Sequence, residues 1–286
     1  MIGCNRLGSN GRLGNQMFQY ASLRGIASNR GFDWMIPPED YNHTANYGLF
    51  ETFNMIGVKE NNIGFVSGGI LMEDGHQFSE ELFEKCPDNV SLDGFFQSEK
   101  YFKNIADEIH QDFSFKNDYL SPCSEYIESL DSSPIFLHIR RGDAIGREQF
   151  HPILPISYYE ECLKEFPEDT PCFVFTDDIG WCKKQELFFN DRFLFNESNG
   201  VYSYKSMDGT GVMSNTILPQ VDLCLMSLCS GAIIANSSFS WWGAWLQNGR
   251  GKVIAPDYKK WFGTAMTHLD TSDIISENWI IKNWSK

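Results

Sequence analysis

Alternation of short apolar strands with helices in the second half of the chain constrains the fold more than any other feature. Residues 135–139 and 172–176 are β-rich apolar runs bounded by turn residues, a pattern typical of buried strands. Polar side chains follow both runs at once, at 140–143 and at 177–178. Strands that alternate with helices form right-handed βαβ units around a parallel sheet, and ligands bind at the carboxyl ends of its strands. The sequence therefore predicts an α/β fold with its site at these strand ends.

Further elements continue the same alternation. A capping box at Ser157 predicts the start of a helix, in which the serine accepts from a backbone N–H and Glu160 reaches back. Pro219 is expected to open a helix that runs to Cys229. A strand at 232–235, a short helix at 239–246 and a strand at 252–255 follow, so the whole second half reads as one α/β domain.

The first half is less regular. The loop at 10–15 leads into a helix that is expected to end before Gly31. Pro, Ser and Asp at 121–123 and at 131–134 are typical of a linker, so we place the domain boundary near 125–134. The expected organisation is two α/β domains, 1–130 and 131–286, that face each other across a cleft.

Charge limits the partners that the chain can bind. Its 286 residues include 23 Lys and Arg against 38 Asp and Glu, a net charge of −15, which repels a polyanion and excludes general nucleic-acid binding. An anionic ligand must be held by a local arginine cluster or by backbone N–H groups. Eight cysteines without a Cys-x-x-Cys pair favour reduced thiols over a zinc or redox site. No secretory signal or transmembrane stretch is visible.

The segment from His138 to Asp143 is a strong candidate for anion binding. Arg140 and Arg141 place two guanidinium groups at a strand end, which is costly to assemble without an anion. A structural Arg–Asp pair is the alternative, and alternation along a strand turns at least one arginine away from the ligand. His138 lies within the apolar run and is either a core residue or a secondary site candidate.

Asp177 and Asp178 follow the next strand, and two roles are possible for their carboxylates. One carboxylate is expected to cap the following helix. A second carboxylate can accept two parallel N–H bonds, the pair of donors that guanine presents. No two aspartates in the chain are separated by one residue, so an Asp-x-Asp metal site is absent and no metal ligands are expected.

Two other segments have free backbone amides beside a predicted helix. The run 236–245 follows a buried strand, and its hydroxyl and N–H groups are suited to phosphate oxygens. Its three tryptophans are either core residues or sugar-stacking faces. The loop 11–16 also precedes a helix, but it has neither the P-loop nor the dinucleotide-binding pattern of glycines.

Together these segments resemble the bacterial type of the α1,2-fucosyltransferase family, a group of inverting enzymes like those of glycosyltransferase family 11. Such enzymes transfer L-fucose from GDP-fucose to the 2-hydroxyl of a terminal galactose with inversion. The resemblance rests on 11–21, 138–143, 173–178, and the stretch from 222–227 through 236–246, which occur in the family's order. The Ser-Ser-Phe-Ser-Trp-Trp-Gly-Ala-Trp run is the most particular to the α1,2 group.

The resemblance implies a GT-B-like architecture of two facing Rossmann-like domains, without metal or other cofactor. The first domain would offer the acceptor surface and the second would bind GDP-fucose. Arg140 would stabilise the leaving diphosphate, His138 and Asp178 would lie near guanine, and Gly14 and Asn15 would close the site. The remaining donor-site residues implied are Arg141, Asp177, Ser237, Ser238, Phe239 and Ser240.

The resemblance gives no firm general base. Glu148 is the first choice, because related α1,6 enzymes carry a catalytic glutamate at a similar offset beyond the Arg motif. Asp143 is the second. The third alternative has no protein base, with departing GDP accepting the proton while Arg140 supplies the electrostatic stabilisation.

Location, acceptor and competing functions follow from the same comparison. The chain begins almost at its first motif, unlike Golgi-anchored animal members, so a cytoplasmic enzyme is expected. Its acceptor would be a surface-polysaccharide precursor or a free oligosaccharide that ends in a β-galactoside. An α1,6- or protein O-fucosyltransferase is the alternative within the enzyme class, and a glycan-binding module is the alternative outside it.

Overall fold

The computed structural model describes residues 1–39, 48–195 and 218–285, which form two compact units. Unit 1 comprises 1–116 and 267–278, and unit 2 comprises 117–266 and 279–286. The first division between the units falls between Lys116 and Asn117. The sequence predicts a later domain boundary, near 125–134. The division into units also assigns a segment close to the C-terminus to unit 1, which no linker signal in the sequence indicates.

Unit 1 contains a four-stranded parallel sheet in the order β2-β1-β4-β3. Its long helix α1 ends at Gly31, which adopts the left-handed conformation (φ 66°) that glycine tolerates best. Ion pairs of Lys100 with Asp273 and of Lys103 with Glu277 hold the 267–278 segment to this unit. The elements are β1 (Ile2–Gly3), α1 (Leu13–Arg30), β2 (Trp34–Met35), α2 (Leu49–Thr52), β3 (Gly69–Met72), α3 (Glu80–Lys85), β4 (Val90–Asp93) and α4 (Ala106–Asp112), with 3-10 turns at Glu60–Asn62, Glu99–Tyr101 and Lys103–Ile105.

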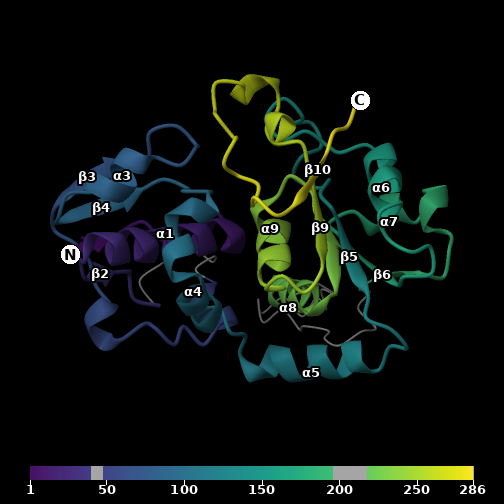
Figure 1. The fold of residues 1–286 in the computed structure, drawn as a ribbon, viewed down its shortest axis with the longest axis horizontal. Coiled ribbons are helices and arrows are strands. Elements are labelled where there is room, and N and C mark those ends of the chain that lie inside the picture. The colour runs from purple at the N-terminus through teal and green to yellow at the C-terminus, as the bar shows by residue number, and fades with distance from the viewer. Residues whose placement is uncertain (40–47, 196–217, 286) are drawn as a thin grey trace, which may run out of the picture. The chain divides into compact units, whose positions relative to one another are not determined.

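Unit 2 contains a six-stranded parallel sheet in the order β10-β9-β8-β5-β6-β7. Figure 1 shows α8 and α9 on one face of this sheet and α6 on the other. The elements are α5 (Asn117–Glu128), β5 (Ile135–Ile139), α6 (Ile156–Leu163), β6 (Cys172–Thr176), α7 (Ile179–Cys182), β7 (Phe193–Phe195), α8 (Pro219–Leu228), β8 (Gly231–Ile233), α9 (Ser238–Trp245), β9 (Lys252–Pro256) and β10 (Ile280–Lys282), with 3-10 turns at Glu186–Phe188, Tyr258–Lys260 and Thr264–Met266.

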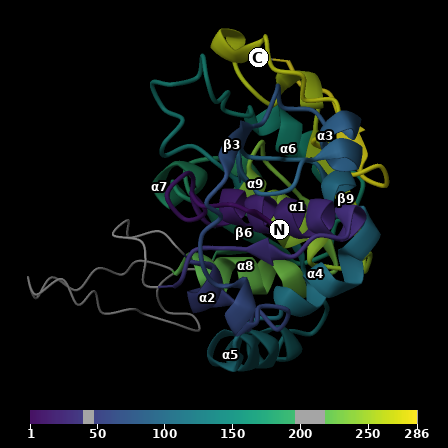
Figure 2. The ribbon, with the colours of Figure 1, turned by 90° about the vertical axis from the view of Figure 1, so that its left-hand side faces the viewer.

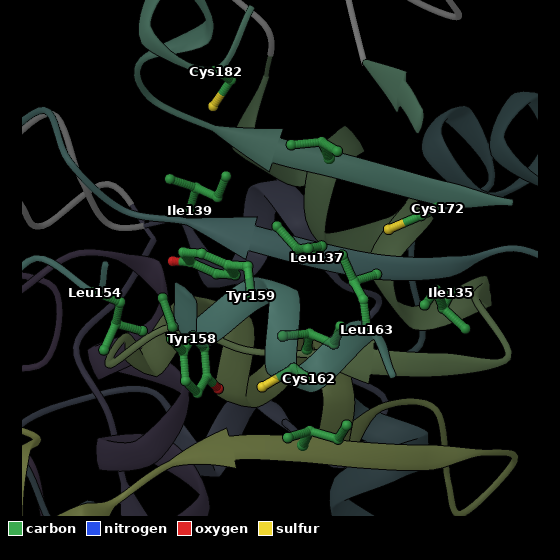
Figure 3. Packing of buried hydrophobic residues seen from close by; sticks show 14 of the residues in the cluster. Ile135, Leu137, Ile139, Leu154, Tyr158, Tyr159, Cys162, Leu163, Cys172 and Cys182 are labelled. Carbon is green, nitrogen blue, oxygen red and sulfur yellow. The ribbon is translucent and has the colours of Figure 1, made fainter. Parts of the chain in front are cut away.

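The two faces of β5 contact different helices of unit 2. Leu137 and Ile139 belong to the buried cluster formed with α6, where Tyr159 and Leu163 pack against the strand (Figure 3). Because successive side chains of a strand point to opposite faces, His138 lies on the other side, and its ring is 6.2 Å from that of Phe239 in α9. The apolar face therefore packs β5 against α6, while the opposite face places His138 beside α9.

Two local expectations from the sequence are wrong. Helix α6 begins at Ile156 after Pro155 and has no side-chain cap, so Ser157 lies inside the helix and forms no capping box. The presumed linker residues 121–123 lie inside α5, which carries Pro122 in its interior. Tertiary packing outweighs the local proline signal, because Cys123 is fully buried and α5 lies along α8 in both views (Figure 1, Figure 2).

Across the described residues, no helix is both long and apolar enough to cross a membrane. Helix α1, the longest one in that part of the chain, has 18 residues and a mixed composition that includes Arg24 and Arg30.

Candidate functional site

Polar side chains gather where β5, β6 and β8 end. Strand β5 lies between the other two in the sheet, so residues that follow it have neighbours on both sides. The Nη1 group of Arg140 donates to the backbone oxygen of Asn236, beyond β8, at 3.2 Å. The backbone N–H of Arg141 donates to Oδ1 of Asp177, beyond β6, at 2.8 Å. The two adjacent arginines thus connect the ends of three strands.

Arg140 is held in a fork by Asp143. Its Nε and Nη2 groups lie 3.0 and 3.1 Å from the two carboxylate oxygens, an arrangement in which both parallel bonds are charge-assisted. The Arg140 side chain is 20% exposed and that of Asp143 is 39% exposed. The structural Arg–Asp pair considered from the sequence is therefore present. It also orients a guanidinium group at the edge where ligands bind in parallel sheets.

Arg141 points toward β6 and is packed on its neighbours. Its guanidinium carbon lies 4.0 Å from the ring centroid of Trp181, and its Nε donates to Oδ2 of Asp178 at 3.1 Å. Asp178 also caps α7, since its Oδ1 accepts the N–H of Trp181 at 3.1 Å. The expected helix cap is confirmed, and the same carboxylate fixes Arg141.

Asp177 occupies the turn beside these residues. Its Oδ1 accepts the Arg141 N–H, and Gly142 lies so close that a Cβ there would sit 2.9 Å from Oδ2. Glycine at position 142 therefore leaves room for the Asp177 carboxylate beside the turn after β5. Guanine recognition by Asp177 or Asp178 stays a prediction.

His138 is neutral in this environment. Burial lowers the pKa of its imidazole from 6.5 to about 4, and neighbouring Asp177 opposes that shift only in part. Its Nδ1 is buried and has no hydrogen-bond partner among the described residues. A buried polar nitrogen without a partner is unusual, which makes His138 a reasonable ligand contact beside Phe239.

The N-terminus of α9 presents the Ser237–Ser240 segment. Ser237 is the N-cap, and its Oγ accepts the N–H of Phe239 at 3.3 Å. Ser238 and Phe239 are half-buried, whereas Ser240 is fully buried and its hydroxyl donates to the backbone oxygen of Ser237. The positive end of the helix dipole favours an anion here, with Ser238 and Phe239 the more accessible residues.

The tryptophans of α9 form part of the core. Trp241 and Trp242 have no exposed surface, and Trp245 is 7% exposed. Trp241 packs against Trp279 with ring centroids 5.2 Å apart. Of the two readings considered from the sequence, core packing is therefore the one that the structure bears out.

The two carboxylates considered as a general base lie in the turn after β5. Asp143 accepts both bonds from Arg140. Glu148 is exposed, and its Oε1 accepts the N–H of Gly146 at 3.1 Å. The backbone beside Glu148 is fixed, because Gly263 donates its N–H to the oxygen of Phe150 at 2.9 Å.

Gly14 and Asn15 belong to unit 1, in the first turn of α1. Gly14 is buried, and Asn15 is half-buried with its Oδ1 accepting from Nε2 of Gln97 at 2.8 Å. Gly11 has a positive φ of 84°, and a Cβ on it would collide with the Asn15 side chain. The loop before α1 is thus shaped around Asn15.

Three residues near these positions were not singled out by sequence reasoning. The buried amide of Asn236 donates to the backbone oxygens of Pro152 and Trp261, at 3.0 and 3.1 Å. The ring of Trp181 packs against the guanidinium group of Arg141, and Gln97 donates a hydrogen bond to Asn15. Only Asn236 had a signal, its place at the start of the 236–245 run. The other two lie far from their partners in sequence.

Metal ligands do not gather anywhere in the described ranges. No three His, Cys, Asp or Glu side chains among those residues are placed to hold an ion. Arg140 and the N-terminus of α9 are the features of unit 2 described above that suit the negative charge of a ligand.

Solved structures support the architecture. The fucosyltransferase NodZ from Bradyrhizobium matches with a TM-score of 0.51 and 15% identity, over 85% of this chain and 91% of that one. POFUT1 in complex with GDP matches with a TM-score of 0.52 and 10% identity, over 88% and 95%. Together with the two parallel sheets, these likenesses show the expected GT-B-like α/β fold.

Sequence relatives show the family. An "Alpha-1,2-colitosyltransferase" of Escherichia coli is 31% identical over 94% of this chain and 96% of its own length. A "Galactoside 2-alpha-L-fucosyltransferase SEC1" of Bos taurus is 23% identical over 87% of this chain and 66% of its own. The model of "Glycosyl transferase family 11" matches residues 1–283. The chain therefore belongs to glycosyltransferase family 11.

Proposed function

We propose that this glycosyltransferase moves L-fucose from GDP-β-L-fucose to the 2-hydroxyl of a terminal galactose, with inversion and without a metal. The family match over residues 1–283 carries the proposal. The bacterial and bovine relatives described above both have names that specify transfer to a 2-position. A structure of the NodZ α1,6-fucosyltransferase soaked with GDP-fucose matches this chain with a TM-score of 0.50, which supports a GDP-sugar donor.

GDP-colitose is a second candidate donor. The bacterial relative that is 31% identical is named for colitose, which is L-fucose without its 3-hydroxyl. The two donors share the guanine nucleotide and the diphosphate, so the strand-end residues of unit 2 would serve either one. They differ by a single hydroxyl group, which a site distinguishes only if it hydrogen-bonds that group.

Departure of GDP places negative charge on the β-phosphate. The guanidinium of Arg140, oriented by Asp143 and by the oxygen of Asn236, is available to stabilise that charge as it develops. Ser238 and Phe239 add the dipole of α9. We assign His138 and Asp178 to guanine.

Glu148 remains our first choice for the base that takes the acceptor proton. Asp143 already accepts two N–H bonds from Arg140, so both of its carboxylate oxygens are engaged in orienting that side chain. We expect Glu148→Gln to lower kcat more than tenfold. A smaller loss would favour the alternative in which departing GDP accepts the proton.

The test is transfer by the purified protein in EDTA, with GDP-fucose or GDP-colitose as donor and a panel of β-galactosides as acceptors. NMR of the product identifies the sugar and its linkage. A new residue on galactose O2 is expected, and the ratio of kcat/KM for the two donors decides between them. Linkage to O6 of N-acetylglucosamine, or to Ser or Thr, would replace the proposal, and failure with both donors would refute it.

A further inference from the structure

The buried side chain of Asn236 joins two other segments of unit 2. Its Nδ2 group donates to the backbone oxygens of Pro152 and Trp261, at 3.0 and 3.1 Å, and the residue is 3% exposed. Because a side-chain amide has two N–H donors, these bonds use both of them. The opposite orientation would place the amide oxygen against two carbonyl oxygens. The contacts therefore fix both the position and the direction of the Asn236 amide.

The two acceptors lie in segments, 149–152 and 261–263, that are themselves held together. The N–H of Gly263 donates to the backbone oxygen of Phe150 at 2.9 Å. A Cβ at Gly263 would lie 2.4 Å from the backbone oxygen of Gln149, so the two backbones are in direct contact there. The buried amide is thus anchored to two segments that support each other.

The backbone of Asn236 contacts the arginine that is proposed to meet the diphosphate. Its oxygen accepts from Nη1 of Arg140 at 3.2 Å, while Asp143 accepts from Nε and Nη2. A guanidinium group has five N–H donors, so these three contacts leave one donor on each terminal nitrogen. These two N–H groups are suited to the oxygens of a phosphate.

The two partners of Arg140 differ in how firmly they are held. Asp143 is 39% exposed and lies in the same turn, three residues further along, so the pair can move together with that turn. Asn236 is buried, follows β8 and is anchored through its own side chain. Its oxygen is therefore the contact that ties the guanidinium group to the core of unit 2.

We propose that Asn236 is a positioning residue for sugar transfer. Its anchored amide holds its backbone oxygen in place, and that oxygen fixes Arg140 so that the two remaining N–H groups meet the departing diphosphate. The inference rests on the proposed function and adds a residue to it. The side chain of Asn236 acts through Arg140 and not by contact with the sugar.

A double-mutant cycle with Arg140 tests this role. Asn236→Leu keeps the size of the side chain but removes both N–H donors, and we expect kcat to fall about tenfold or more. KM for the donor should change by less than about threefold, because the charge that Arg140 meets develops in the transition state. In the Arg140→Ala background the same substitution should cost less than about twofold. Equal losses in both backgrounds, or a near-normal kcat for Asn236→Leu, would overturn the inference.

Asn236→Ser is the second variant for this cycle. Its hydroxyl group keeps one donor, so its kcat should lie between those of the wild type and Asn236→Leu. The smaller, polar side chain keeps the test decisive where the leucine variant does not fold. A loss that disappears in the Arg140→Ala background supports the role, and an equal loss in both backgrounds overturns it.

Gln247→Met is the matched control. Gln247 is also a buried amide of unit 2, 1% exposed, whose Nε2 donates to the backbone oxygens of Met226 and Gly231 at 3.0 and 3.2 Å. Gly231 begins β8, whereas Asn236 lies beyond the other end of that strand. The control should keep its kcat within about twofold of the wild-type value, whatever its effect on Tm. A loss equal to that of Asn236→Leu would indicate general loosening of unit 2 and would refute positioning.

A second measurement does not depend on which sugar is transferred. In protein with ¹⁵N-labelled arginine, the Nε–H signal of Arg140 is identified by its absence from Arg140→Ala. It should shift and exchange faster with water in Asn236→Leu, because the group loses a buried partner, and should match the wild type in Gln247→Met. An unchanged signal in Asn236→Leu would refute the inference. Failure of wild-type transfer accompanied by the expected shift would instead refute the proposed function alone.

Discussion

Two neighbouring arginines have different roles because their partners differ. Arg141 is stacked on Trp181 and bonded to Asp178, which caps α7, so it stabilises the turn between β6 and α7. Arg140 is bonded to Asp143 and to a backbone oxygen, and its side chain keeps 20% of its surface exposed. Arg140 is therefore the one suited to meet a diphosphate.

Arg140→Ala should lower kcat about 100-fold or more, because the departing diphosphate loses a charge-assisted partner. The fold should survive, since Asp143 is 39% exposed and can be hydrated when its partner is removed. Steady-state kinetics and Tm measure the two effects. Arg147→Ala removes an exposed charge from the same turn and should keep near-normal activity. Equal activity of the two variants would exclude a special role for Arg140.

His138 should make stability depend on pH. Its pKa is about 4 when folded and about 6.5 when unfolded. Between these values the unfolded chain binds a proton that the folded chain does not, so stability falls as the pH drops from about 6.5 to about 4. At pH 5 the loss is about 2 kcal/mol relative to pH 7. Urea unfolding should show a shallower decline for His138→Phe, and parallel curves would contradict this assignment.

Elements were predicted well from sequence where the signal was local. The strands Ile135–Ile139 and Cys172–Thr176 have the expected bounds, because apolar runs end sharply at polar turn residues. Pro219 opens α8 as expected. The predictions from Ser157 and Pro122 were wrong, because tertiary packing decided where α6 begins and where α5 ends.

Some residues of the candidate site could likewise be predicted from local sequence signals, and others could not. Arg140 and Asp177 come directly after strands, so their placement at one sheet edge followed from the order of elements. Gln97 contacts Asn15 from the irregular segment after β4, and Trp181 contacts Arg141 from α7, and neither contact follows from a local sequence pattern. The positive φ of Phe96, the residue before Gln97, is visible only in the folded chain.

Close packing of α9 on α8 should make Gly243 irreplaceable. A Cβ at this position would lie 2.8 Å from both Cβ and Sδ of Met226, so Gly243→Ala should destabilise the protein by about 1–3 kcal/mol. Gly180→Ala in α7 is the control, because nothing lies within 4 Å of its new Cβ. That variant should gain up to about 1 kcal/mol. Urea unfolding compares the two, and equal effects would contradict this view of the packing.

At the scale of the whole molecule, charge and chain organisation limit where an anionic donor binds. The net charge of −15 disfavours anions over most of the surface. Arg140 and the N-terminus of α9 oppose that background locally, and both belong to unit 2. Unit 2 is not one continuous stretch of sequence, since residues 267–278 belong to unit 1. The nucleotide should therefore stabilise unit 2 on both sides of that segment.

Hydrogen exchange with and without GDP tests this assignment. At 100 times its Kd, GDP should stabilise the structure that binds it by about 2.7 kcal/mol, because it binds only the folded form. Protection should increase at 140–143 and 236–240, and through the sheet at β9 and β10, which pair residue by residue with each other. Strands β1 and β4 of unit 1 should exchange as before. Protection confined to residues 1–116 would place the nucleotide in the other unit and would remove Arg140 from the proposed mechanism.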